Sequence, residues 1–221
     1  VFGGMVVVIE RGGDPRASLA RLFVHRRFAG SVAVGLLLNF AMYVMLFVEA
    51  LFLQNDRRDS AWAAGLTLLP FTFGPIYSTR LSGRFISTGG RIHTMAIMGL
   101  LAGALGALIL CAGGGAAPLG ALLAGLGLLG GGMGLVVPAI TAGALSATAR
   151  ENSGIASGVL SSARQAGGLF GVAVMGALAQ GRPPATGPAR ALGGACVVLV
   201  AGAGIAQGLL REGNGPMPNN G

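Results

Sequence analysis

The sequence has no lysine and few charged residues of any kind. Its 221 residues include 15 basic residues, all of them arginine, and 7 acidic ones, so charged residues make up 10% of the chain. About a quarter of the residues are charged in a typical soluble domain. Because so few charges do not cover a water-facing surface, the composition excludes a soluble domain of this length.

Aromatic residues, histidines and cysteines are also scarce. The aromatic share is 6%, and the chain has 2 histidines and 2 cysteines. Cys111 and Cys196 lie inside apolar runs, whereas His25 and His93 lie near the ends of such runs. They form neither a metal-ligand spacing nor a nucleophile–base pair. The sequence therefore predicts no cofactor, no metal and no enzymatic activity.

The chain is rich instead in apolar residues and glycine. Hydrophobic residues make up 53% of it, the mean hydropathy is +0.74, and 41 residues are glycine. A net charge of +8 would suit nucleic-acid binding, but that function needs a basic stripe on a soluble face. Here the arginines stand in short gaps between apolar runs, as membrane proteins place them. We expect an all-α transmembrane protein in contact with the lipid bilayer, and no nucleic-acid partner.

Six segments have the length and apolar character of membrane spans. A helix needs about 20 mainly apolar residues to cross a bilayer. The predicted spans are residues 30–53, 62–80, 93–112, 118–145, 154–180 and 190–210. The connections between them are short, so residues 30–210 are predicted to form one six-helix domain.

The two ends of the chain differ from this domain. Residues 1–10 lack the basic region and cleavage site of a signal peptide, so we expect them to be the end of a truncated transmembrane helix. Residues 11–29 are predicted to be a basic cytoplasmic lead-in, either an amphipathic segment on the membrane surface or a plain linker. Residues 211–221 are polar and predicted to be a disordered cytoplasmic tail.

The arginines predict the orientation, because successive connections face opposite sides of the membrane. Ten of them fall on one side: Arg11, Arg16, Arg21, Arg26, Arg27, Arg80, Arg84, Arg91, Arg150 and Arg211. Four fall on the other side: Arg57, Arg58, Arg182 and Arg190. By the positive-inside rule the first set is cytoplasmic. We therefore expect a multi-pass protein of the cell membrane with a cytoplasmic C-terminus.

Glycines and prolines within the spans predict close packing and bent helices. Small residues four apart let membrane helices approach closely, as at Gly99/Gly103, Gly127/Gly131, Gly130/Gly134, Gly154/Gly158, Gly167/Gly171 and Gly204/Gly208. Pro70, Pro75 and Pro138 fall inside predicted spans, where a proline removes a backbone hydrogen bond and kinks the helix.

Arg164 is a candidate functional residue because it lies inside a span. It is about ten residues, or about 15 Å, from the cytoplasmic end of residues 154–180. A charge at that depth is costly, so a role in function is expected, with hydrogen bonding to backbone carbonyls as the structural alternative. Gln165 points about 100° away around the helix and faces a different neighbour.

Residues 30–53 carry the other candidates. Glu49, near the outer end, is either an interfacial carboxylate in contact with water or a proton- or cation-binding acid that lines a cavity. Asn39 and Tyr43 are one turn apart, and they either line the same cavity or serve in packing.

Four stretches resemble the major facilitator superfamily, and more narrowly the C-terminal half of its 14-helix drug:proton antiporters. They are residues 21–40, 46–54, 63–91 and 132–178, the last with the Ser161-x-x-Arg164-Gln165 signature. The resemblance covers nearly the whole chain. It implies a six-helix C-domain of two inverted three-helix repeats, and a missing N-terminal half that holds most of the proton-coupling acids.

The connection that follows the second span carries a gating-loop motif of the family. Gly83, Arg84, Gly89 and Arg91 match it, whereas residues 87–88 are Ser and Thr where the family usually has an acid or a second base. The resemblance implies that this loop helps to hold one conformer closed.

The resemblance implies a secondary transporter that exports amphipathic drugs or metabolites in exchange for protons by alternating access. Its partners would be a small amphipathic substrate, protons and the N-terminal half. The alternative is a truncated half-transporter with no transport of its own, serving as a structural or partner subunit. A six-helix channel subunit is disfavoured because no filter-like re-entrant segment is visible in the sequence.

Overall fold

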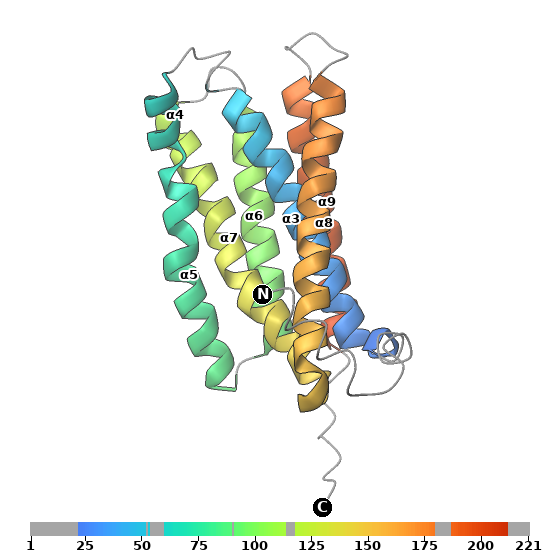
Figure 1. Ribbon diagram of the computed structural model, residues 1–221. Helices are drawn as coiled ribbons and strands as arrows, with labels where there is room; N and C mark the ends of the chain where they lie inside the picture. The colour runs from blue at the N-terminus through green and yellow to red at the C-terminus, as the bar shows by residue number, and fades with distance from the viewer. Residues whose placement is uncertain are drawn as a thin grey trace, which may run out of the picture.

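The described part of the chain is a bundle of long helices that lie side by side (Figure 1). The computed structural model describes residues 22–51, 53, 60–89, 91–113, 118–179 and 187–211. All regular structure within these ranges is helical, and they contain no strand. The predictions for residues 1–21 and 212–221, which include the truncated helix and the tail, lie outside the described residues.

A helix occupies each of the six predicted segments. The helices are α3 (Arg26–Leu51), α4 (Ala61–Thr67), α5 (Leu69–Ser87), α6 (Ile92–Gly113), α7 (Leu119–Ser146), α8 (Ser153–Ala179) and α9 (Gly187–Arg211). A short 3-10 helix, η3 (Arg150–Asn152), precedes α8. The helix α3 begins four residues before the predicted span, inside the segment that was expected to be a lead-in.

The second predicted span is divided into two helices. The helix α4 ends at Thr67, and Pro70 occupies the first turn of α5. A proline has no N–H to donate and is preorganised for the first turn of a helix. Pro70 therefore marks the start of α5 rather than the interior of one long helix, and that it kinks a membrane span stays a prediction. Pro75 and Pro138 do lie inside helices, in α5 and α7.

The end of α5 corrects the predicted gating loop. Gly83 and Arg84, which were expected in a connection, lie in the last turns of α5. The backbone N–H of Thr88 donates to the Arg84 carbonyl at 3.1 Å, which closes the helix. Gly89 then adopts a φ of 86°, a left-handed conformation that favours glycine and ends many helices. Gly89 and Arg91 are therefore the motif residues that lie between α5 and α6.

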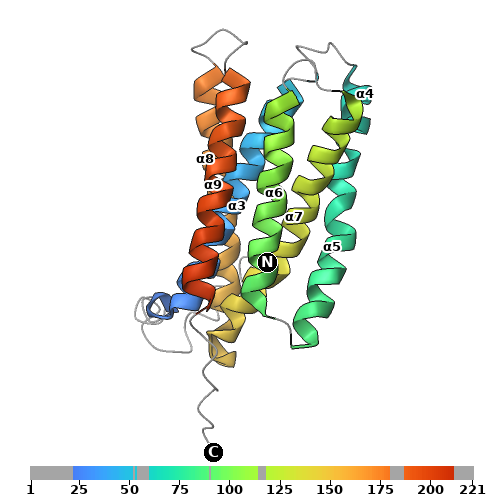
Figure 2. The same ribbon diagram turned by 180° about the vertical axis from the view of Figure 1, so that it is seen from behind.

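The helices are arranged around two central members, α3 and α7. In Figure 1 the helices α5, α7 and α8 face the viewer, and Figure 2 shows α6 and α9 on the opposite side. The helix α3 packs along α8 and α9, while α7 packs along α5 and α6. The helices α7 and α8 touch each other only sparsely. Both views show that α3 and α7 run in opposite directions.

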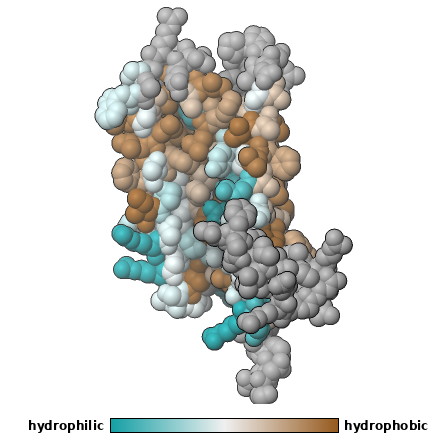
Figure 3. Space-filling view, in the orientation of Figure 1, coloured by the Kyte–Doolittle hydropathy of each residue, from teal (hydrophilic) through white to brown (hydrophobic). Residues whose placement is uncertain are grey.

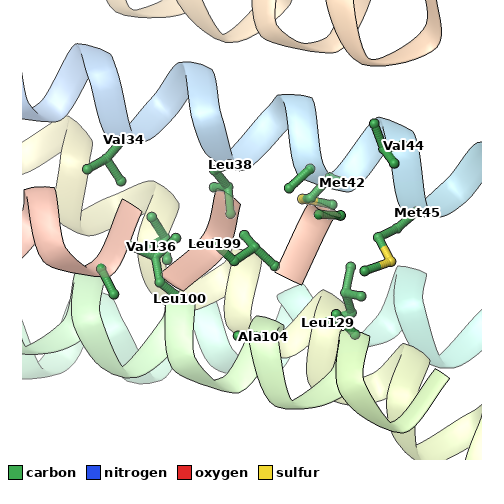
Figure 4. Packing of buried hydrophobic residues seen from close by; sticks show 14 of the residues in the cluster. Val34, Leu38, Met42, Val44, Met45, Leu100, Ala104, Leu129, Val136 and Leu199 are labelled. Carbon is green, nitrogen blue, oxygen red and sulfur yellow. The ribbon is translucent and has the colours of Figure 1, made fainter. Parts of the chain in front are cut away.

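The buried apolar core lies where α3, α6, α7 and α9 meet. Figure 4 shows side chains of α3 directed at those of the other three helices: Val34, Leu38, Met42 and Met45 against Leu100, Ala104, Leu129, Val136 and Leu199. The outer surface is apolar as well, since Leu101, Leu105 and Leu108 of α6 are exposed. A helix that is apolar on both its buried and its exposed sides suits a lipid environment.

Three of the helices are long and apolar enough to cross a membrane. These are α3, residues Ile92–Ala112 of α6, and α7. The other long helices carry more polar residues, such as Arg80 and Arg84 in α5 and Arg164 in α8. That α5, α8 and α9 also span a membrane stays a prediction.

Glycines allow α6 and α7 to touch backbone to backbone. A Cβ added at Gly99 would lie 2.6 Å from the carbonyl oxygen of Gly132 and 2.6 Å from Cγ2 of Val136. Of the predicted glycine pairs, Gly154/Gly158 and Gly204/Gly208 face open space, since a Cβ added at any of the four would meet nothing within 4 Å. Close packing through small residues is therefore confirmed at some of the predicted pairs.

The change Gly99→Ala tests this contact. The added methyl group has to push the two backbones apart, so we expect a loss of about 1–3 kcal/mol of stability. The matched control is Gly204→Ala in α9, where nothing lies within 4 Å and stability should be unchanged or slightly higher. Melting of the purified variants in detergent measures both effects, and equal melting temperatures for the two would contradict the close approach.

Candidate functional site

Arg164 lies in the angle between three helices. Its Cγ atom would be 3.1 Å from a Cβ at Gly35, so the stem of the side chain passes over the bare backbone of α3. Leu160 of α8 and Ile140 of α7 approach the same point to 3.2 and 3.3 Å. Arg164 is therefore held by α3, α7 and α8 together, and Gly35 leaves the space that its stem fills.

The guanidinium of Arg164 lacks an acidic partner among the described residues. The side chain is half-buried, and its Nε atom is buried without a hydrogen-bond partner. The two acids that the structure describes are distant. Glu151 precedes α8, more than about 16 Å of helix from Arg164, and Glu49 is about 21 Å further along α3 than Gly35.

Asn39 and Tyr43 share with Gly35 the side of α3 that faces α8, since the three residues are four apart. The Nδ2 atom of buried Asn39 donates to the Gly35 carbonyl at 3.1 Å. The Tyr43 ring lies over Gly168, with Cδ2 2.9 Å from where a Cβ would stand, and 41% of Tyr43 is exposed. The structure therefore brings Arg164, Asn39 and Tyr43 to one seam between α3 and α8.

Gln165 lies on the exposed side of α8, away from this seam. Ser157 and Ser161 precede it at four-residue intervals and are also exposed, so the three form a polar stripe along α8. Figure 3 shows pale and teal patches between brown areas on the side that α5, α7 and α8 face. Ser161 was part of the signature with Arg164 and Gln165, whereas Ser157 and Gly35 were not identified from the sequence, although their four-residue spacing from Ser161 and from Asn39 was a signal for them.

Glu49 is separate from the other candidates. It follows Met42 and Met45 by seven and four residues, so it continues the side of α3 that faces the bundle interior in Figure 4. Only 3% of it is exposed, and its Oε2 atom is buried without a hydrogen-bond partner. This burial goes against the alternative of an interfacial carboxylate in contact with water, and the role of Glu49 stays a prediction. Glu49 also lies about 120° around α3 from Tyr43.

No protein-family model matches the chain. The chain is 35% identical to the methylenomycin A resistance protein of Streptomyces coelicolor, over 71% of this chain and 33% of that protein. It is 33% identical to the multidrug resistance protein Stp of Mycobacterium tuberculosis, over 76% of this chain and 31% of Stp. The tetracycline resistance determinant of Streptomyces rimosus is 35% identical, over 76% of this chain and 48% of that protein.

Over the matched part of its length, this chain is similar to these drug-resistance proteins. The recognition of a drug-efflux relative from the sequence motifs is thereby confirmed. The relatives are named for resistance rather than for an enzymatic activity, which confirms the expectation that the chain is not an enzyme. The chain spans about a third of the length of the first two relatives and about half of the third.

Substitution of Glu49 tests whether its carboxyl is unpaired in the folded protein. Since a buried polar group without a partner costs about 1–3 kcal/mol, we expect Glu49→Met, which keeps most of the volume, to raise the melting temperature in detergent. Glu49→Ala serves as the control, because it removes the carboxyl but opens a cavity and should not be stabilising. A clear loss of stability in Glu49→Met would mean that the carboxyl is engaged.

Proposed function

We propose that the chain is the C-terminal six-helix domain of a major facilitator drug exporter that exchanges its substrate for protons. The observation that carries this proposal is an arginine on a polar seam of an otherwise apolar bundle, with no acidic partner among the described residues. A charge in that position is costly and is retained where a substrate or ion passes. The relatives are named for resistance to methylenomycin A and to tetracycline, and we propose a small-molecule drug as the substrate, amphipathic as the family resemblance implies.

The way the helices interlock supports a pair of inverted repeats. Suppose that α3 to α6 form one repeat and that α7 to α9 form the other. The first helix of each repeat then packs along the later helices of the other repeat. The helix α3 lies against α8 and α9, and α7 lies against α5 and α6. The two first helices also run in opposite directions. Transporters with inverted repeats place their substrate sites where the repeats meet.

The face formed by α5, α7 and α8 is the proposed wall of the transport pathway. It carries the polar stripe of α8, and Arg164 reaches it from the seam with α3. In the complete exporter the N-terminal half would cover this face, and rocking of the two halves would open it to each side in turn. Gln165, Tyr43 and Asn39 are proposed to line or brace the pathway. The turn at Gly89 and Arg91 would stabilise one of the two states.

We further propose that the end of the bundle with the α5–α6 turn is cytoplasmic. Arg84, Arg91 and Arg150 are exposed at or near that end, which is the lower one in Figure 1. The C-terminal end of α9 lies at the same end.

Single cysteines at opposite ends of the bundle test this orientation. Ser60→Cys and Thr88→Cys both replace exposed residues, in a background where Cys111 and Cys196 are replaced by alanine. A membrane-impermeant maleimide added to intact cells should label the cysteine at position 60 and spare the one at position 88, and lysis should expose both. Labelling of position 88 in intact cells would reverse the proposed orientation.

Expression in a host that lacks its own drug exporters tests the proposed function. The complete reading frame that contains these residues should raise resistance to tetracycline or other amphipathic drugs several-fold, and Arg164→Ala should remove most of that gain. The matched control is Arg150→Ala, which changes an exposed arginine outside the seam. Substrate-driven pH change in proteoliposomes reports the proton exchange. Normal membrane levels of the protein without any gain in resistance would contradict the proposal.

A further inference from the structure

We propose that Arg164 binds the acidic group, a carboxylate or an enolate, of an amphipathic substrate. The inference rests on the proposed transport function and names the substrate class that this site would take. It follows from the charge of the seam, from the donors left free there, and from the surfaces beside them.

The charge at the seam is uncompensated within the described residues. Both described acids lie far from Arg164, and Glu49 faces the bundle interior on another side of α3. A guanidinium among apolar side chains is costly unless an anion neutralises it. A cationic substrate would be repelled at this point, whereas an acidic one would supply the missing charge.

The donors at the seam fit a planar oxyanion. The Nε atom of Arg164 is buried and has no hydrogen-bond partner among the described residues. A guanidinium presents its N–H groups in a fixed fork that matches the two oxygens of a carboxylate. Asn39 donates one Nδ2–H to the Gly35 carbonyl, so that N–H is not available to a bound anion.

The surroundings of Arg164 fit a molecule with one acidic end and an apolar body. Tyr43, whose ring lies over Gly168 one turn beyond Arg164, is partly exposed and offers a polar group that a bound molecule can reach, and exposed Gln165 follows Arg164 on the neighbouring side of α8. Leu169, one turn beyond Gln165 on α8, is 73% exposed and offers apolar surface. The stripe of Ser157 and Ser161 leads from the site toward the beginning of α8, so an anion would meet hydroxyl groups along that way.

A matched pair of probes tests the proposal by binding, without any need for transport. Dansylglycine carries a carboxylate, and dansylglycinamide replaces it with a neutral amide of similar size. With the complete protein in nanodiscs, and with binding to empty nanodiscs subtracted, we expect the acid to bind about tenfold more tightly, which corresponds to about 1.4 kcal/mol. Arg164→Gln should remove this preference and leave the affinity for the amide unchanged. Arg150→Gln should leave both affinities as in the wild type.

Several outcomes would overturn the acid-binding role. One is equal affinity of the wild type for the two probes, which needs no variant and so holds even if Arg164→Gln fails to fold. Another is an equal loss of both affinities in a folded Arg164→Gln, because that result assigns Arg164 to the structure or to a carboxylate on covering helices of the complete protein. Arg164→Lys keeps the positive charge but lacks the fixed pair of N–H groups of a guanidinium. It should therefore retain part of the preference for the acid over the amide.

Transport of the same probes in proteoliposomes separates this inference from the proposed function. A protein that binds the acid selectively and transports neither probe nor drug would contradict the exporter and leave the acid site in place. A protein that exports drugs but treats the two probes alike would support the exporter and contradict the acid site.

Discussion

The close approach of α8 to α3 is the contact on which the candidate site depends. A Cβ at Gly171 would lie 2.7 Å from the Phe40 carbonyl oxygen, and one at Gly167 would overlap the Leu36 carbonyl, so neither position has room for a side chain. Lipid is as apolar as the helices, and van der Waals packing of small residues therefore has to hold them together. The same contact sets the register that places Arg164 beside Gly35.

The register of α8 against α3 has two opposite effects on Arg164. Close packing removes water from Arg164, which makes its charge expensive, while the missing side chain at Gly35 gives its stem a place to lie. The helix α3 is in firm contact with α8, whereas α7 and α8 touch only sparsely. The seam is therefore built mainly by α3 and α8, and α7 closes it with few contacts to α8.

Much of the fold was predictable because it depends on features of short stretches of sequence. Apolar run length located all six segments, and the position of Arg164 within one of them identified the seam residue. Local reasoning failed where a single residue has two structural uses. Pro70 fits the first turn of a helix as well as a kink, and Gly83 and Arg84 fit a helix as well as a loop. The neighbours of Arg164 were not predictable, since Gly35 is distant in sequence and nothing local pairs the two.

Glu49 and Arg164 are two ionisable residues with different surroundings. The difference comes from the direction in which each side chain points and not from its depth in the membrane. Both belong to long helices that contact each other, yet Glu49 continues a row of methionines into the core while Arg164 lies at an edge reached from the polar stripe of α8. At the core position Glu49 is 3% exposed, and its Oε2 atom has no partner among the described residues. The edge position offers exposed polar neighbours and a face that is free to be covered. On the proposed pathway, a solute at this face therefore meets the guanidinium of Arg164 and not the carboxyl of Glu49.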